Sequence, residues 1–208
     1  MRTRSKLILA GLAATLLMSL AVSSASANRL SISNTRARIV WTEYVLTSGE
    51  GGERLVTCPL TLEGSFHSAT IAKVIGALIG HINRASFAEA SCRGGRMTIS
   101  QASLPWHITY EGFAGTLPRI TEITLLLRGM NYTLEIFGVV CGYGRPEENL
   151  RAIANVESSG AITSLAADTS IALAKLSGGI LCPGTSGFSG RASVTLQGNT
   201  TRITVRLI

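Results

Sequence analysis

Hydroxyl and imidazole groups that could carry out hydrolysis lie together in one short run of the chain, Ser65-Phe66-His67-Ser68. A hydrolase site also needs an orienting carboxylate, and its members usually come from distant parts of a chain. The chain contains a single aspartate, Asp168, and no G-x-S-x-G sequence. These observations favour a capping or turn role for the two serines. The alternative function is a secreted hydrolase with an unrecognised site, formed by Ser65, His67, His107 and Glu111.

Carboxylates and histidines elsewhere do not predict a further site. Glu111 and Glu122 could face one another across adjacent strands, as in a glycosidase, but eleven glutamates spread over a chain produce such pairs by chance. A calcium loop needs several Asp or Asn oxygens, and the chain has one aspartate. His67, His81 and His107 lack the H-x-H or H-x-x-x-H spacing of zinc ligands. We therefore predict no catalytic residue, no metal and no cofactor.

The best candidate for a binding surface is the run Leu104-Pro105-Trp106-His107 together with Tyr110. On one exposed strand face, Trp106, His107 and Tyr110 would offer a flat apolar platform with polar tips, suited to sugars or peptides. The alternation of Trp106, Ile108 and Tyr110 is also that of an inward face. Aromatic residues make up only 5% of the chain, so the core needs them, and this favours the second interpretation.

Four cysteines, Cys58, Cys92, Cys141 and Cys182, are widely spaced. In an exported chain this pattern favours disulfides over metal ligation or thiol chemistry, and there is no C-x-x-C motif. Four cysteines allow three pairings. We predict Cys58 with Cys92 and Cys141 with Cys182, because sequential pairing closes two separate loops of similar size.

Residues 1–27 have the layout of a cleavable secretory signal. Basic residues precede the apolar stretch 7–22, and the small residues Ala25-Ser26-Ala27 follow it. The stretch is shorter than the roughly 20 apolar residues of a membrane-spanning helix. We expect cleavage before Asn28, no stable membrane insertion afterwards, and a secreted, extracellular product.

Removal of this segment lowers the net charge from +7 to +4, because three of the 19 basic residues and none of the 12 acidic ones belong to it. The remaining arginines are scattered singly, and Lys73 and Lys175 are the only lysines left. A nucleic-acid-binding protein would gather its basic residues with interleaved aromatics. The sequence therefore argues against a nucleic-acid partner and leaves an envelope glycan or another secreted protein as candidates.

Strand patterns cover most of residues 28–208, which we expect to form a single domain. Strands are predicted at 36–46, 55–62, 106–113, 120–127, 132–140, 192–196 and 202–207, with hairpin turns at 92–96, 128–131 and 197–200. Pro59 argues for an edge position or a bulge in its strand. Residues 161–175 favour a strand over an alanine-rich helix, and 146–160 show no readable pattern.

One short helix is predicted near 69–79. Apolar residues recur there with the spacing of one helical face, at Ile71, Val74, Ile75, Leu78 and Ile79. A serine precedes the segment and a glycine follows it, as at helix ends. Gly76 opposes the helix by about 1 kcal/mol relative to alanine.

Two stretches of the chain carry a resemblance: Phe66-His67-Ser68 with Lys73-Val74-Ile75-Gly76-Ala77-Leu78-Ile79-Gly80, and Leu104-Pro105-Trp106-His107 with Gly115-Thr116-Leu117-Pro118. They resemble an uncharacterised family of small secreted, disulfide-containing bacterial proteins. The resemblance would span most of the mature chain and implies export and disulfides, but no activity.

The sequence as a whole predicts a mainly β, antiparallel sandwich or barrel with meander hairpins and one short helix. We expect an exported, non-enzymatic binding or structural module, associated with the cell envelope, a glycan or another protein. This interpretation rests on the missing catalytic groups and the disulfide framework.

Overall fold

The computed structural model describes residues 29–49, 52–116, 118–144, 149–167 and 172–208. The predicted signal segment at 1–27 lies outside these residues, as do Asp168 and the Thr169-Ser170-Ile171 run. Within the described part of the chain, no helix has the length and apolar character needed to cross a membrane.

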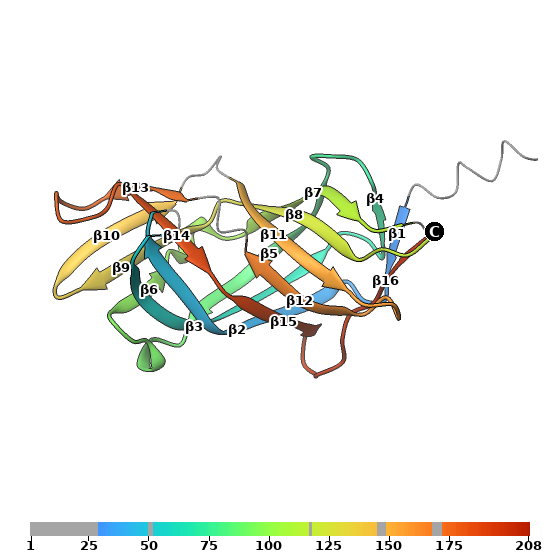
Figure 1. Cartoon of the computed structure of the whole chain (residues 1–208), viewed down its shortest axis with the longest axis horizontal. Helices are drawn as coiled ribbons and strands as arrows, with labels where there is room; N and C mark the ends of the chain where they lie inside the picture. The colour runs from blue at the N-terminus through green and yellow to red at the C-terminus, as the bar shows by residue number, and fades with distance from the viewer. Residues whose placement is uncertain (1–28, 50–51, 117, 145–148, 168–171) are drawn as a thin grey trace, which may run out of the picture.

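Eight antiparallel strands close into a barrel, which is the centre of the molecule (Figure 1). They are β2 (Arg36–Ser48), β3 (Arg54–Phe66), β5 (Leu78–Phe87), β7 (Trp106–Ala114), β8 (Glu122–Arg128), β11 (Asn149–Val156), β12 (Ile162–Ala167) and β15 (Arg191–Leu196). They neighbour one another in this order, and β15 returns to pair with β2, from Trp41 opposite Ala192 to Ala37 opposite Leu196. The predicted β-rich, antiparallel fold is confirmed, and the barrel strands follow one another as a meander.

Alternation of side chains fills the barrel with apolar groups. On β2, Ala37, Ile39 and Trp41 are buried, whereas Arg36 and Arg38, which alternate with them, are exposed. A closed barrel has no free strand edge, so each inward face packs against the others. The inward side chains join one continuous core with those of the remaining strands.

Five further strands extend one end of the barrel as a second sheet (Figure 1). They are β6 (Arg96–Ile99), β9 (Asn131–Ile136), β10 (Val139–Gly144), β13 (Leu173–Ser177) and β14 (Thr185–Ser189). Their order from the barrel outward is β14, β13, β10, β9 and β6, and β14 pairs with the last residues of β2. In the sequence, each of them lies between two consecutive barrel strands. Because β2 pairs with both β15 and β14, it belongs to both sheets.

A small third sheet lies at the opposite end of the molecule (Figure 1). It consists of β1 (Arg29–Ile32) between β4 (Thr70–Ala72) and β16 (Val205–Leu207). Leu30, Ile71 and Val205 are buried and belong to the common core. This sheet therefore covers one end of the barrel with apolar side chains.

One disulfide joins a barrel strand to the connection before β6, and the other lies within the second sheet and its connections. Cys58 of β3 is bonded to Cys92, just after the short 3-10 helix Glu89–Ser91. Cys141 of β10 is bonded to Cys182, in the segment between β13 and β14. Both predicted pairs are confirmed.

The predicted helix near 69–79 is wrong. The segment forms β4, a turn and the start of β5, with Val74 60% and Ile75 77% exposed. Gly76 has a φ of +79°, which suits a turn and not a helix. The N–H of Gly76 donates to the carbonyl of Tyr110, and the N–H of Tyr110 donates to the carbonyl of Ala77. Pairing with β7 thus satisfies backbone groups that a helix would have satisfied internally.

The predicted hairpins at 92–96 and 128–131 are also wrong in their pairing. β6 pairs with β9 and not with β5, while β8 lies between β7 and β11. The predicted strand 132–140 is itself a hairpin, in which Phe137 and Gly138 both have positive φ between β9 and β10. The turn at 197–200 forms, but the chain then leaves it to pair β16 with β1.

Two other strand predictions fit the described residues. Pro59 lies opposite the register shift of β2 between Trp41 and Tyr44, in accordance with the bulge predicted for it. The strand predicted at 161–175 appears as β12 and β13 on either side of 168–171. The stretch 146–160, for which the sequence showed no readable pattern, contains β11.

All four tyrosines have pKa values raised by burial, so the protein should lose stability at alkaline pH. They are Tyr44, Tyr110, Tyr132 and Tyr143. The unfolded chain ionises near the ordinary tyrosine value of about 10, whereas the folded chain retains these protons. This contribution to stability is therefore complete below pH about 10 and decreases as the pH rises above it.

We expect the tyrosinate absorbance at 295 nm to rise together with loss of the circular dichroism of the sheet. A smooth rise of absorbance with the fold intact would contradict this burial.

Candidate functional site

The predicted binding platform does not form, because two of its three members lie inside the protein. Trp106 and Tyr110 are 0% and 2% exposed, and His107 between them is exposed on the other face of β7. The indole Nε1 of Trp106 donates a hydrogen bond of 3.0 Å to Ser103 Oγ. Trp106 and Tyr110 are core residues, in accordance with the alternation of their strand.

The residues considered for a hydrolase are only partly brought together. His67 Nε2 lies 3.2 Å from His81 Nδ1, and Ser65 and His107 lie directly opposite His81 on the strands at either side. Glu111 instead forms a two-pronged ion pair with Arg151, with N to O distances of 2.8 and 2.5 Å. The carboxylate that would orient a catalytic histidine is therefore engaged elsewhere.

The paired glutamates of a glycosidase are not opposite one another. Glu122 lies opposite Ala114 on β7, and Glu111 falls at a register shift between Tyr110 and Gly112. In the described segments, no group of three or more His, Cys, Asp or Glu side chains is placed to hold a metal ion.

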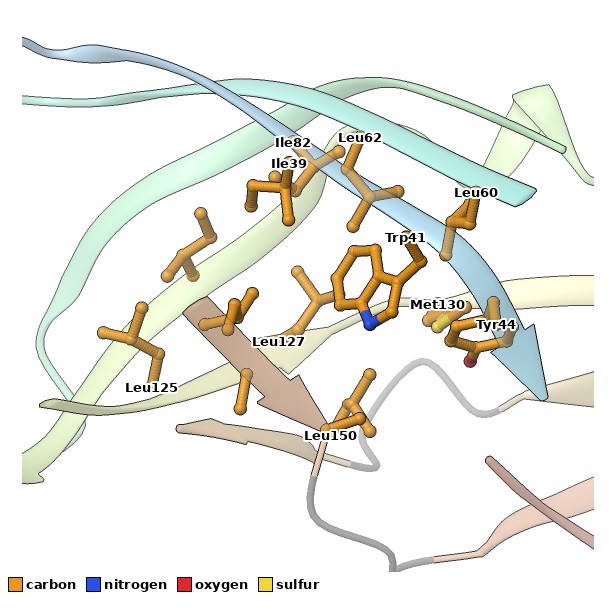
Figure 2. A pocket seen from close by; sticks show the side chains of 14 residues that line it. Ile39, Trp41, Tyr44, Leu60, Leu62, Ile82, Leu125, Leu127, Met130 and Leu150 are labelled. Carbon is orange, nitrogen blue, oxygen red and sulfur yellow. The ribbon is translucent and has the colours of Figure 1, made fainter. Parts of the chain in front are cut away.

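The interior of the barrel contains an apolar cavity of about 50 Å³ (Figure 2). Its fourteen lining residues are all aliphatic, aromatic or methionine, and include Leu127, Met130 and Leu150. They come from seven of the eight barrel strands and from Met130 just after β8. A site so lined excludes charged ligands, because a buried charge without a partner costs many kcal/mol.

Two hydrogen-bonding groups interrupt this apolar lining. The indole Nε1 of Trp41 and the hydroxyl of Tyr44 are buried, and neither has a hydrogen-bond partner among the described residues. Trp41 is 4% and Tyr44 1% exposed. In Figure 2 both polar atoms are turned toward the part of the cavity that Leu150 bounds. Each unpartnered buried group costs about 1–3 kcal/mol, so the free protein is destabilised here.

Aromatic packing fixes both rings. The Trp41 and Tyr44 rings meet edge to face, with centroids 5.9 Å apart and an interplanar angle of 84°. Phe188 stacks on Tyr44 at 5.6 Å and 12°. These contacts restrict the orientation of both rings, and with them the positions of the two hydrogen-bonding atoms.

A second cavity of about 40 Å³ continues the interior space. It shares Ile39, Ile82 and Leu125 with the first cavity and ends at Phe66 and Ile203. On β2, the first cavity reaches Tyr44 and the second reaches Ala37, so the two follow one another along the barrel. Aliphatic side chains alone separate them.

Sequence reasoning missed this site because of the bulge in β2. Simple alternation from Trp41 would turn Glu43 inward and Tyr44 outward. The register shift between Trp41 and Tyr44 leaves both Thr42 and Glu43 exposed and returns Tyr44 to the interior. The two consecutive polar residues between Trp41 and Tyr44 are the signal in the sequence that could have indicated this bulge.

Comparison of the chain with protein-family models, curated proteins and solved structures finds no match. The resemblance to a family of secreted bacterial proteins therefore stays a prediction.

Replacing Tyr44 by Phe should stabilise the free protein. The change removes a buried hydroxyl that has no partner in the described structure, and we expect the free energy of unfolding to rise by about 1 kcal/mol. Tyr132→Phe is the matched control, because the Tyr132 hydroxyl donates a 2.8 Å bond to Ser186 Oγ. That variant should lose about 1 kcal/mol. Urea unfolding measures the change in the free energy of unfolding for each variant. Equal destabilisation by both substitutions would contradict an unpartnered hydroxyl at Tyr44.

Proposed function

We propose that the protein is an exported, non-enzymatic binding module that holds a small, uncharged, mostly apolar ligand inside its barrel. The observation that carries this proposal is the pair of buried, unpartnered groups, Trp41 Nε1 and the Tyr44 hydroxyl, beside an apolar cavity. Both can donate a hydrogen bond. A ligand with one neutral oxygen acceptor, such as a ketone, ester or ether, would satisfy them.

The cavity favours a slender ligand. An apolar cavity of about 150 Å³ holds benzene, whereas the first cavity has about 50 Å³. A straight aliphatic chain could extend from the oxygen acceptor at Trp41 and Tyr44 into the second cavity if the shared side chains Ile82 and Leu125 change rotamer. Each methylene taken from water would contribute about 0.8 kcal/mol.

Export is part of the proposal. The two disulfides are compatible with an oxidising, extracytoplasmic compartment. The layout of residues 1–27 supports a secretory signal, with a mature N-terminus near Asn28. A surface platform for glycans loses its support, because Trp106 and Tyr110 are buried in the core.

Ligand binding should depend on the oxygen acceptor and on the length of the aliphatic chain. We expect straight-chain 2-alkanones to raise the thermal midpoint of the mature, disulfide-bonded protein more than alkanes of equal length, because an alkane leaves Trp41 and Tyr44 unpartnered. Fatty carboxylates should bind far more weakly because the cavity is apolar. Tyr44→Phe should weaken ketone binding about fivefold to tenfold and leave alkane binding unchanged.

The same titration can contradict the proposal in two ways. Equal shifts for ketones and alkanes would remove the role of Trp41 and Tyr44. No shift with any chain length would mean that the barrel interior is a closed core. Tyr132→Phe, which lies outside the cavity lining, controls for a general effect of losing a tyrosine hydroxyl.

A further inference from the structure

All three histidines of the chain gather on one part of the outer barrel surface. His67 follows β3, His81 lies on β5 and His107 lies on β7. His81 is directly opposite His107 in the β5–β7 pair, and the rings of His67 and His81 have centroids 5.3 Å apart. His67 and His107 are exposed and His81 is half-buried, so solvent ions can reach them. These residues are 14 and 26 positions apart in the sequence, and only the strand pairing brings them together.

The distance between two ring nitrogens fits a shared metal ion. His67 Nε2 and His81 Nδ1 are 3.2 Å apart. Imidazole nitrogens bind Zn²⁺ at about 2.0–2.1 Å, so two of them in one coordination sphere are about 2.9–3.4 Å apart. In the free protein this contact is a hydrogen bond, so one of the two nitrogens carries a proton. Metal binding replaces that bond and requires both rings in the tautomer that leaves these two nitrogens unprotonated.

The backbone holds both histidines in place. The N–H of His67 donates a 2.9 Å hydrogen bond to the carbonyl of Ile79. His81 belongs to a strand that is paired on both sides, with Ser65 and His107 as its opposite residues. Because a backbone hydrogen bond holds His67 and two neighbouring strands hold His81, the backbone of the pair loses little conformational freedom when a metal binds.

We propose that His67 and His81 form a surface site for a divalent transition-metal ion, with Cu²⁺ preferred over Zn²⁺. Imidazole suits both ions, and Cu²⁺ is bound more tightly at a given nitrogen site. Water occupies the remaining coordination positions, because the described residues provide no third His, Cys, Asp or Glu within the set. The ring contact among these residues is the one between His67 and His81, which favours this pair over a site that includes His107. The site lies outside the barrel and is independent of the proposed interior ligand.

Titration of tag-free, mature protein with CuCl₂ tests the site by isothermal calorimetry and by electron paramagnetic resonance. We expect one Cu²⁺ ion per chain with nitrogen hyperfine structure from two imidazoles. His67→Gln, at an exposed position, should weaken binding at least about tenfold. His107→Gln is the matched control, also exposed, and should leave the affinity within about twofold and the spectrum unchanged.

Circular dichroism confirms that both variants remain folded. Equal weakening by His67→Gln and His107→Gln would overturn the two-histidine site, and so would binding that neither substitution changes. A repeat with ZnCl₂ should give weaker binding with the same dependence on His67.

Discussion

Closure of β15 onto β2 is the constraint on which the rest of the structure depends. Five residue pairs, from Trp41 with Ala192 to Ala37 with Leu196, join the last barrel strand to the first. Because closure pairs the first barrel strand with the last, the inward faces of eight strands form one continuous apolar interior. Polar atoms that enter this interior must find a partner there or remain unsatisfied. The cavity and the two unpartnered groups at Trp41 and Tyr44 are consequences of that closure.

The site lies where β2 passes from one sheet to the other. Residues 37–41 of β2 pair with β15, residues 45–48 pair with β14, and the bulge lies between them. Gly190 joins β14 to β15 with a φ of +140°, and a Cβ atom there would lie 2.6 Å from the carbonyl oxygen of Glu43 and 3.1 Å from Trp41 Cδ1. Glycine is therefore required at this crossing. The change of partner strand produces the bulge, and the bulge turns Tyr44 toward the cavity beside Trp41.

Local patterns in the sequence predicted the strands and the disulfides, whereas the partners of the strands depended on distant contacts. Alternation around Trp106 and Tyr110 correctly indicated an inward face, and chain order gave both cysteine pairs. The spacing of the apolar residues from Ile71 to Ile79 fits a helix as well as two strands joined by a turn at Gly76. Backbone hydrogen bonds to β7 stabilise the strands and the turn, and the sequence spacing does not show these bonds. The histidine pair was hidden because register between strands, and not spacing along the chain, places His67 beside His81.

The proposed function requires that Trp41 Nε1 donates its hydrogen bond to a bound ligand. The chain has two tryptophans, and the second, Trp106, already donates to Ser103 Oγ, so its indole signal is an internal reference. The most direct measurement is a ¹H–¹⁵N correlation spectrum of the indole groups, recorded without ligand, with a 2-alkanone, and with an alkane of equal length. We expect the ketone to move the Trp41 indole proton downfield relative to its position with the alkane, while the Trp106 signal stays in place. An unchanged Trp41 signal at saturating ketone, or shifts confined to residues outside the barrel, would contradict it.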